Sequence, residues 1–520
     1  RVPSAASDVY KRQGYAFFVF SFFLDERGRS FMETLTVQFK QIKKQYGAKE
    51  VLSIEALSAY HGERIGIIGR NGEGKSTLLK LITGEIQPDS GTIQTTTTFN
   101  YFAQIGGIED SYDFSSVDWE IISRFSLPKH SMDSWSGGEA AKSRLVRTLS
   151  NYEMGLLLDE PTTHLDQKSI SLLIEELRHY YGTLLFVSHD RFFLNQLATK
   201  IWEIDQGCVR EYHGNFDAYK QQKKMELLHQ KHAFESHLKE KKRLEAAIES
   251  KLQQAAKISK VSKKMQQKNS RPDRLASSKQ KDTIQKNLHK TAKAMKSRLD
   301  HLGEHHSLTE PRQIIFAAPK GIEIHNPYPI KGHNVSIQYE QRVLFDDCDF
   351  QFGLGKRIAI VGANGCGKTT LLNHILNDGK GIVLSPKVVF ASYQQLSYKM
   401  TESESILVYL MKQTDYSESF VRSILHNLGF YQTEILKPVK KLSGGEATRV
   451  QIALLFVKPA NVLILDEPTN FIDLPTIVAL EKLMRDYLGT VIFTSHDQLF
   501  VDRVANEVYQ VVDQKLKKIT

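Results

Sequence analysis

Two patterns of hydrophobic and polar positions divide the chain. In the first, short and continuous apolar runs at 64–68 and 357–361 lead into glycine-rich turns, and each turn leads into a helix pattern, at 77–82 and 370–375. Continuous rather than alternating apolar runs are typical of strands that are buried on both faces of a parallel sheet. The pattern therefore predicts an α/β fold, in which functional groups gather at the carboxyl ends of the strands.

The second pattern occupies the middle of the chain and is helical. Neither Gly nor Pro occurs over 216–269, and both are absent again over 277–302. Apolar residues recur there at intervals of three and four, which predicts two amphipathic helices with a narrow apolar seam. Arg-Pro-Asp at 271–273 interrupts the pattern and predicts a turn near 270–276. We expect an antiparallel helical hairpin in which about 40 residues of helix extend ~60 Å from the body.

The remaining sequence contains two copies of one module. Four motifs of the first half recur in the second: GRNGEGKS at 69–76 as GANGCGKT at 362–369, SGGE at 136–139 and 443–446, DEPT at 159–162 and 466–469, and SHD at 188–190 and 495–497. The last three share an offset of 307 residues (443 against 136), whereas the first is offset by 293 (362 against 69). Two homologous domains with one insertion of variable length explain both offsets.

Composition narrows the class of protein. Apolar residues make up 41% and charged residues 25% of the chain, which is typical of a globular protein and excludes wholesale disorder. Three cysteines without a CxxC pair exclude a disulfide scaffold and a Cys-rich metal module, and they favour a cytoplasmic location. The apolar run at 15–24 is too short to cross a bilayer and no signal-cleavage site follows it, so we expect 1–31 to lie outside the native fold.

The positive charge of the chain is concentrated in the predicted hairpin. The net charge is +10, yet residues 218–304 alone hold 23 Lys/Arg against 9 Asp/Glu. No acidic residue occurs over 250–272, where the expected RNA-binding residues are Lys251, Lys257, Lys260, Lys263, Lys264, Lys268 and Arg271. A solvated helix face normally alternates its charges, so this segment favours binding to a phosphate backbone.

Each glycine-rich turn has the pattern GxxxxGK[ST] between a strand and a helix, which is typical of a phosphate-binding loop. Its backbone N–H groups approach the phosphates, the lysine pairs with the β- and γ-phosphate oxygens, and the hydroxyl binds Mg²⁺. The predicted ATP-binding residues are Gly69, Asn71, Gly72, Gly74, Lys75, Ser76 and Thr77, and in the second domain Gly362, Asn364, Gly365, Gly367, Lys368, Thr369 and Thr370.

Acidic residues and a histidine complete each predicted site. Asp159 and Asp466 end apolar strands, where a carboxylate can hold Mg²⁺ together with Ser76 or Thr369. Glu160 and Glu467 follow directly and can orient or deprotonate the attacking water. His189 and His496 lie 29 residues further on, at the end of another strand, where they can contact the γ-phosphate and the water.

These motifs resemble those of the ABC ATPase family, whose signature is SGGE. The resemblance implies two P-loop ABC nucleotide-binding domains in tandem, joined by an α-helical hairpin linker, each domain closing its signature over the nucleotide of the other. It implies that Ser443, Gly444 and Gly445 complete the first site, and that Ser136, Gly137 and Gly138 complete the second. It also implies that Tyr46 and Tyr339 stack on adenine, and that Gln104 and Gln395 contact Mg²⁺. In departures from the family, Trp135 replaces a Leu and Phe471-Ile472 replaces His-Leu before Asp473.

Two ABC modules fused through a basic hairpin resemble, more narrowly, the ABC-F proteins. That resemblance implies the ribosome as partner, with the hairpin directed at large-subunit ribosomal RNA, peptidyl-site tRNA and the peptidyl transferase centre. Ser136 follows Gln104 by only 32 positions, whereas Ser443 follows Gln395 by 48. The first module thus lacks room for the extra arm of housekeeping members, which favours the antibiotic-resistance branch.

We therefore expect a cytoplasmic, monomeric ATPase that uses ATP and Mg²⁺ and protects the ribosome from large-subunit antibiotics. The alternatives are a housekeeping ABC-F translation factor, the ATPase subunit of an ABC transporter, a coiled-coil ABC protein that acts on DNA, and a scaffold that binds nucleotide without hydrolysis. The expected divisions are the leader 1–31, the first ATPase domain 32–215, the hairpin 216–306, a connector 307–330 and the second ATPase domain 331–520.

Overall fold

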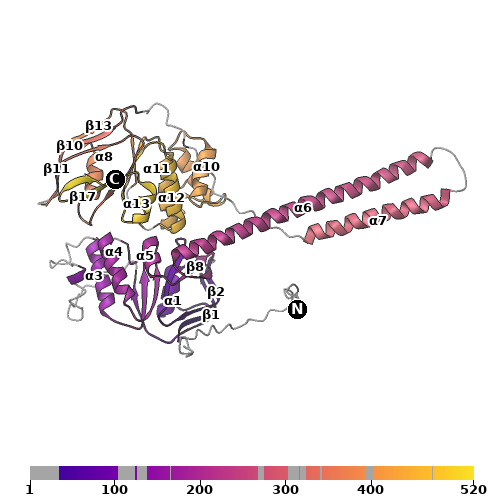
Figure 1. Ribbon diagram of the computed structural model, residues 1–520, viewed down its shortest axis with the longest axis horizontal. Coiled ribbons are helices and arrows are strands. Elements are labelled where there is room, and N and C mark those ends of the chain that lie inside the picture. Colours follow the sequence, from indigo (N-terminus) through magenta and orange to yellow (C-terminus); the bar gives the residue numbers. More distant parts are fainter. Residues whose placement is uncertain are drawn as a thin grey trace, which may run out of the picture.

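The structure is a computed structural model that describes residues 34–47, 49–103, 123–125, 137–163, 165–266, 274–301, 316, 324–339, 342–393, 402–470 and 472–519. Only the backbone is described at 255, 257–266, 274–283, 285, 300 and 301. Two α/β domains face each other, and a helical hairpin extends sideways from between them (Figure 1). We call them the N-terminal domain, whose last strand ends at His213, and the C-terminal domain, whose first strand begins at Ile330.

Each domain contains a six-stranded, mostly parallel sheet, and the strand order is the same in both. In the N-terminal domain the order is β5 (Phe99–Phe102), β6 (Gly155–Asp159), β7 (Thr183–Val187), β3 (Arg64–Gly69), β8 (Lys200–Asp205) and β9 (Cys208–His213). In the C-terminal domain it is β14 (Phe390–Tyr393), β15 (Val462–Leu465), β16 (Thr490–Thr494), β12 (Arg357–Val361), β17 (Glu507–Val512) and β18 (Lys515–Lys518). Only the last pair of each sheet is antiparallel. The predicted duplication and α/β class are confirmed.

A small antiparallel sheet packs beside each large one. Its strands are β2 (Lys49–Tyr60), β1 (Leu35–Tyr46) and β4 (Ser90–Thr95) in the N-terminal domain, and β11 (Arg342–Phe352), β10 (Ile330–Tyr339) and β13 (Ile382–Leu384) in the C-terminal domain. Alternate residues of β6 belong to different apolar clusters: Leu157 packs with the small sheet, whereas Leu156 and Leu158 pack with helices on the opposite face. This two-sided burial explains why the apolar runs are continuous.

Four helices recur in both domains. They are α1 (Lys75–Thr83) and α8 (Lys368–Leu376), α3 (Gly137–Ser150) and α11 (Gly444–Val457), α4 (Gln167–Arg178) and α12 (Leu474–Asp486), and α5 (Arg191–Leu197) and α13 (Gln498–Val504). The described part of the C-terminal domain also contains α9 (Ile406–Met411), α10 (Glu418–Asn427) and the 3-10 turns η3 (Glu434–Leu436) and η4 (Val439–Lys441). Most of the corresponding stretch of the N-terminal domain, where we expect a shortened segment, lies outside the described residues, as do Trp135 and Phe471.

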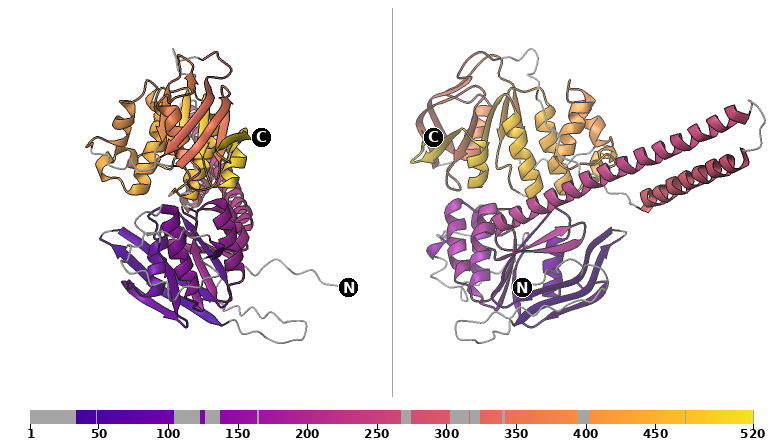
Figure 2. Two further views of the ribbon diagram at one scale, coloured as in Figure 1. Left: turned by 90° about the vertical axis from the view of Figure 1, so that its left-hand side faces the viewer. Right: turned by 45° about the vertical axis from the view of Figure 1, so that its right-hand side comes forward.

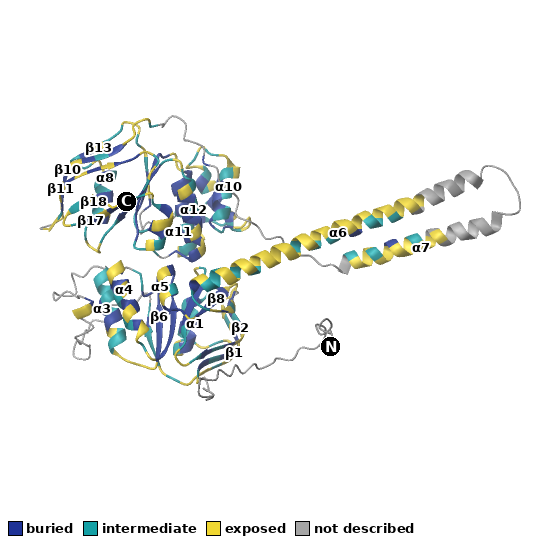
Figure 3. Ribbon diagram, in the orientation of Figure 1, coloured by how far each residue is buried: buried dark blue, intermediate teal, exposed yellow. Residues whose placement is uncertain are grey.

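The hairpin consists of α6 (Phe216–Gln266) and α7 (Arg274–His301), which lie side by side in the views of Figures 1 and 2. Leu244 of α6 and Ala292 of α7 are buried between them, and Arg298 lies 3.1 Å from Glu240 (Nη2 to Oε1). Most of the other described side chains along the hairpin are exposed or only partly buried (Figure 3). The predicted antiparallel pair is confirmed, and its turn lies outside the described residues.

The bounds of the two helices lie close to the stretches predicted at 216–269 and 277–302. α6 has 51 residues and α7 has 28, so the part in which the two helices lie side by side is limited by α7 to about 42 Å, whereas α6 alone is about 77 Å long. The first turns of α6 lie on the N-terminal domain, where Tyr219 and Lys223 both bind Glu203 of β8, at 2.8 and 2.6 Å. α7 also begins at Arg274, inside the segment where a turn was predicted. An apolar period marks a helix, but it does not show where that helix leaves the body.

Candidate active site

The phosphate loop between β3 and α1 is wrapped around its own lysine. Lys75 Nζ donates to the carbonyl oxygens of Gly69 at 2.9 Å and Arg70 at 3.1 Å. The turn requires glycine at Gly74, where φ is 98° and an added Cβ would lie 2.7 Å from Val51 Cγ1. Burial lowers the pKa of Lys75. A buried cation at the start of α1 favours an anionic ligand.

The second loop repeats this arrangement. Lys368 Nζ donates to Gly362 O at 3.0 Å and Ala363 O at 3.2 Å, and it also lies 3.4 Å from His496 Nε2. Gly367 has a φ of 99°, the counterpart of Gly74. The two predicted loops thus have nearly the same geometry.

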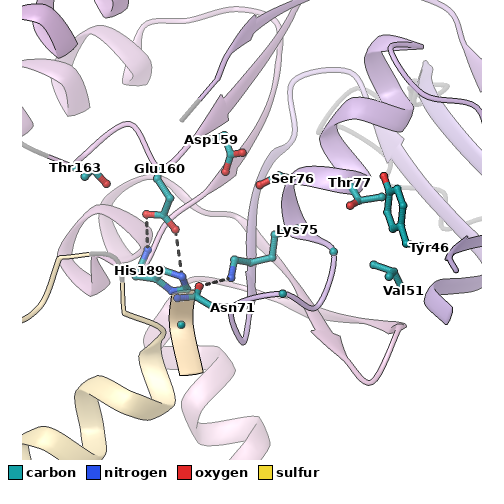
Figure 4. A pocket seen from close by; sticks show the side chains of 13 residues that line it. Tyr46, Val51, Asn71, Lys75, Ser76, Thr77, Asp159, Glu160, Thr163 and His189 are labelled. Carbon is teal, nitrogen blue, oxygen red and sulfur yellow. Dashed lines mark hydrogen bonds and ion pairs between the residues drawn. The ribbon is translucent and has the colours of Figure 1, made fainter. Parts of the chain in front are cut away.

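Asp159 ends β6 beside the loop (Figure 4). Burial raises the pKa of Asp159, and a hydrogen bond with the Ser76 side chain opposes the shift. Tyr101 adds a hydroxyl donor 3.4 Å from Oδ2. In the second site Asp466 accepts from Thr494 Oγ1 at 2.7 Å. A carboxylate and a hydroxyl that meet in this way present the hard oxygen ligands that suit Mg²⁺.

Glu160 and Glu467 have the same unusual backbone conformation. Their φ angles are 51° and 45°, in the left-handed region that non-glycine residues seldom adopt. Glu160 N donates to Val187 O at 3.0 Å and Glu467 N donates to Thr494 Oγ1 at 2.9 Å, so each conformation is anchored to the neighbouring strand. Such backbone conformations concentrate at functional sites.

Each glutamate faces the histidine predicted to act with it. Glu160 Oε1 lies 3.2 Å from His189 Nε2, and Glu467 Oε1 lies 3.3 Å from His496 Nε2 (Figure 4 shows the first pair). Burial lowers the pKa of His189 well below its ordinary value and that of His496 to about 4, so both imidazoles are neutral at pH 7.

Burial also raises the pKa of both glutamates, to about 7. A carboxyl group that titrates near neutral pH is suited to general base catalysis, because it is ionised and still accepts a proton well. The cause is desolvation in both sites, and Lys75 or Lys368 partly opposes it.

We expect the nucleotide-free E160Q/E467Q variant to melt several degrees above the parent at pH 8. In the unfolded chain both carboxyls return to an ordinary pKa near 4.5, whereas in the folded protein it is about 7. The folded protein therefore binds more protons between these values, and each glutamate destabilises it increasingly as the pH rises through that window. Thermal unfolding by circular dichroism, without Mg²⁺ or nucleotide, should show the difference shrinking towards pH 5. E418Q, at an exposed position, is the control for the substitution itself, and an equal advantage of E160Q/E467Q at pH 5 and pH 8 would contradict the raised pKa values.

The first site is built from both domains. Its cavity of about 400 Å³ is lined by Lys75, Asp159, Glu160 and His189, and by Gly445 at the start of α11. Gly445 also packs closely on Asn71, since a Cβ at Gly445 would lie 3.0 Å from Asn71 Cβ. Ser443 caps α11 through a reciprocal capping box with Glu446. The start of a capped helix thus faces the phosphate loop of the opposite domain.

A second contact across the interface occurs at both sites. Asn71 N donates to Asp473 Oδ2 at 3.1 Å, and Asn364 N donates to the Asp166 carboxylate. We did not assign Asp166 or Asp473 a role in the sites, although they obey the 307-residue offset of the repeat. The shared offset could therefore have predicted that Asp166 and Asp473 have the same role in the two sites.

The structure describes both tyrosines that are predicted to stack on adenine, but it does not describe every other predicted site residue. Tyr46 lines the first cavity together with Val51 and is 52% exposed. Tyr339 is also exposed, at the end of β10. Ser136, Gln104 and Gln395 lie outside the described residues, so their roles stay predictions. Gly137 and Gly138 begin α3, as Gly444 and Gly445 begin α11.

The comparisons with known proteins agree with this geometry. The family described as ABC transporter matches residues 53–163 and 345–470, and a related family of the same description matches residues 202–285. The erythromycin resistance ATP-binding protein MsrA of Staphylococcus epidermidis is 42% identical over 490 residues, which are 94% of this chain and 100% of that relative. The ribosome protection protein VmlR of Bacillus subtilis is 32% identical, over 93% of this chain and 87% of that relative.

The solved structures agree on the fold. A crystal structure of the archaeal ribosomal stalk protein aP1 with the archaeal ribosome recycling factor aABCE1 matches with a TM-score of 0.60 and 17% identity, over 90% of this chain and 87% of that chain. In the parts of the chain that the structure describes, no helix is both long and apolar enough to cross a membrane. The repeated phosphate loops, the signature that faces them across the interface and the likeness to MsrA and VmlR over nearly the whole chain show that this protein is an ATPase of the ABC-F subfamily, similar to its antibiotic-resistance members.

Proposed function

We propose that this chain is an ATP-driven ribosome-protection factor that counters antibiotics acting on the large ribosomal subunit. The observation that carries the proposal is the combination of a composite ATP site with a basic hairpin whose first turns bind Glu203 of the N-terminal domain. Two relatives that cover nearly the whole chain are named for erythromycin resistance and ribosome protection, and both lend support.

In this proposal the cycle begins with ATP and Mg²⁺. Lys75 and Lys368 hold the phosphates, and the oxygens of Asp159 with Ser76, and of Asp466 with Thr369, hold the metal ion. Bound Mg²⁺ would neutralise charge on the β- and γ-phosphates. Among the described residues no three His, Cys, Asp or Glu side chains form a metal site by themselves, which suits an ion that needs nucleotide to complete its ligands. Gln104 and Gln395 are proposed as further Mg²⁺ contacts, and Tyr46 and Tyr339 as adenine platforms.

Hydrolysis then reopens the domains. Glu160 and Glu467 take a proton from the attacking water, while neutral His189 and His496 contact the γ-phosphate. Loss of that phosphate removes the group that the opposite signature (Ser443 to Gly445, or Ser136 to Gly138) binds, so the domains separate. ATP therefore favours the ribosome-bound state and hydrolysis favours release, with the protein acting as a monomer in the cytoplasm.

The hairpin is proposed to enter the large subunit towards the peptidyl transferase centre and peptidyl-site tRNA. Lys251 is partly buried on α6, and the side chains of the other six predicted RNA-binding residues lie outside the described part of the chain. Neutralising a phosphate backbone releases counterions, so binding there should weaken steeply as the salt concentration rises.

Expression of the chain in a sensitive bacterial strain should raise the minimal inhibitory concentration of at least one large-subunit antibiotic, erythromycin being the first to test. Co-sedimentation with 70S ribosomes in ATP, compared at stated salt concentrations, is the accompanying measurement. Normal ATP hydrolysis without ribosome association or resistance would refute the proposal, and efflux of drug with co-purification of a permease would favour a transporter subunit instead.

A further inference from the structure

One buried ion pair joins the two domains close to the first site. Arg191 Nη1 lies 2.6 Å from Glu481 Oε1, and the two side chains are 1% and 3% exposed. Arg191 is the first residue of α5 and directly follows His189 and Asp190, whereas Glu481 lies in α12 of the C-terminal domain. The pair therefore ties the loop of a predicted catalytic residue to the opposite domain.

The repeat does not contain a second copy of this pair. The 307-residue offset aligns Arg191 with Gln498 and Glu481 with Ile174. Gln498 instead accepts a hydrogen bond from Gln167 Nε2 at 3.3 Å, in an exposed position. Phosphate loops, glutamates and histidines are duplicated, so the ion pair breaks an otherwise regular symmetry of the interface.

Other charges surround the pair and connect it to both histidine loops. Asp190 caps α5 and Asp497 caps α13, each directly after its histidine. Burial raises the pKa of Asp190 to about 6 and raises that of Asp497, and the positive charge of Arg191 opposes both shifts. Arg503 Nη1 lies 3.5 Å from Glu481 Oε2.

The root of the hairpin belongs to the same cluster. Burial is the main cause that lowers the pKa of Lys220 in α6, and the charges of Arg503 and Arg191 lower it further while those of Asp217 and Glu481 oppose them. Movement of the C-terminal domain relative to Arg191 thus changes the field at the start of α6.

A buried ion pair contributes little net stability, because desolvation offsets the attraction between its charges. It is instead sensitive to register: if the domains close out of register, Arg191 is buried without the carboxylate that accepts its hydrogen bond, and Glu481 keeps only its 3.5 Å contact with Arg503, which is unfavourable. Arg191 also leaves Nε and Nη2 without a hydrogen-bond partner among the described residues, so Glu481 supplies the one direct hydrogen bond that the structure shows for its guanidinium. The guanidinium is accommodated only when Glu481 is in place.

We infer that Arg191 and Glu481 are positioning residues that admit a single register of domain closure and thereby align the His189 loop for hydrolysis. The pair acts through α5, which it holds against α12 when the domains are closed. Among the described residues, the hydrogen bond within the pair and its contact with Arg503 lie outside the phosphate loops and the signatures, so we expect that binding of nucleotide to one open domain does not depend on it.

The test is a double-mutant cycle on ATP hydrolysis and nucleotide binding. R191M and E481M alone should each lower kcat at least about tenfold. E481M leaves the buried Arg191 guanidinium without its one direct hydrogen bond, and R191M leaves the buried Glu481 with only Arg503, 3.5 Å away in its own domain. The dissociation constant for ADP, which lacks the γ-phosphate that the opposite domain contacts, should change by less than about twofold, and R191M/E481M should recover kcat to within about threefold of the parent.

Two matched controls separate this role from general damage. Q498M changes the repeat-equivalent of Arg191, and R422M breaks the exposed 2.6 Å pair of Arg422 with Glu418; neither should alter kcat more than about twofold. Thermal unfolding and ADP binding report whether the single variants are folded. Losses in kcat that simply add in R191M/E481M, or ADP affinity that falls in step with kcat, would overturn the inference. The experiment measures ATP hydrolysis without ribosomes, so its result tests the roles of Arg191 and Glu481 separately from the proposed function.

Discussion

Replacing Glu160 and Glu467 together with glutamine should lower the kcat of ATP hydrolysis about 100- to 10,000-fold, the usual contribution of a general base. Glutamine has nearly the same shape and can still hydrogen-bond to the histidine loop, but it cannot accept the proton of the attacking water. ATP should therefore still close the domains, and the closed state should persist. Release of phosphate measures the loss of hydrolysis, and sedimentation through sucrose measures the fraction of protein held on 70S ribosomes.

Glu418 provides the matched control, because E418Q removes an exposed carboxylate of the same type far from the interface charges. That variant should hydrolyse ATP normally and leave ribosomes normally. If E160Q/E467Q kept more than a tenth of the parental kcat, another group would be the base. If it lost hydrolysis but sedimented free of ribosomes in ATP, closure would not be the ribosome-binding state.

Replacing residues 251–276 with a short Gly-Ser turn should return drug susceptibility to that of cells without the protein. The change removes the most basic end of the hairpin but leaves the contacts of Tyr219 and Lys223 with Glu203, so basal ATPase activity should stay within about twofold. Susceptibility testing and phosphate release on the same preparations measure the two effects.

A second variant separates charge from length. Glutamine at the seven predicted RNA-binding positions keeps the hairpin but removes its positive charge, so it should weaken ribosome association and flatten its dependence on salt. Unchanged resistance in the shortened protein would show that the hairpin end takes no part in protection. An unchanged salt dependence in the glutamine variant would show that these seven side chains do not contact phosphate.

The parts of the site that could be predicted are those that the chain repeats. Lys75, Glu160 and His189 each have a counterpart in the second domain. The apolar runs before Glu160 and His189 predicted their place at strand ends, and the glycine-rich turn predicted Lys75 at the start of a helix. Continuous apolar runs predicted the strands because each run is buried on both faces, as the split packing of Leu157 and Leu158 shows. The α6–α7 pair followed from its apolar period and from the absence of Gly and Pro.

The parts that escaped prediction depend on contacts between distant segments. Arg191 and Glu481 are 290 residues apart, and their equivalents, Gln498 and Ile174, give no hint of a charged pair. The left-handed conformation of Glu160 is equally invisible, since its sequence neighbours differ little from an ordinary strand end. The place where α6 leaves the body depends on the packing of its root on β8, a tertiary contact that helical periodicity does not encode.

The unbroken course of α6 has a mechanical consequence. A single helix of 51 residues, about 77 Å long, begins on the N-terminal domain and continues outward without a hinge residue such as Gly or Pro. It therefore works as a lever: tilting its root by about 10° would sweep the far end through roughly 13 Å. A small closing movement of the domains, without internal rearrangement of either one, would thus displace the far end of α6 by more than the length of two helical turns.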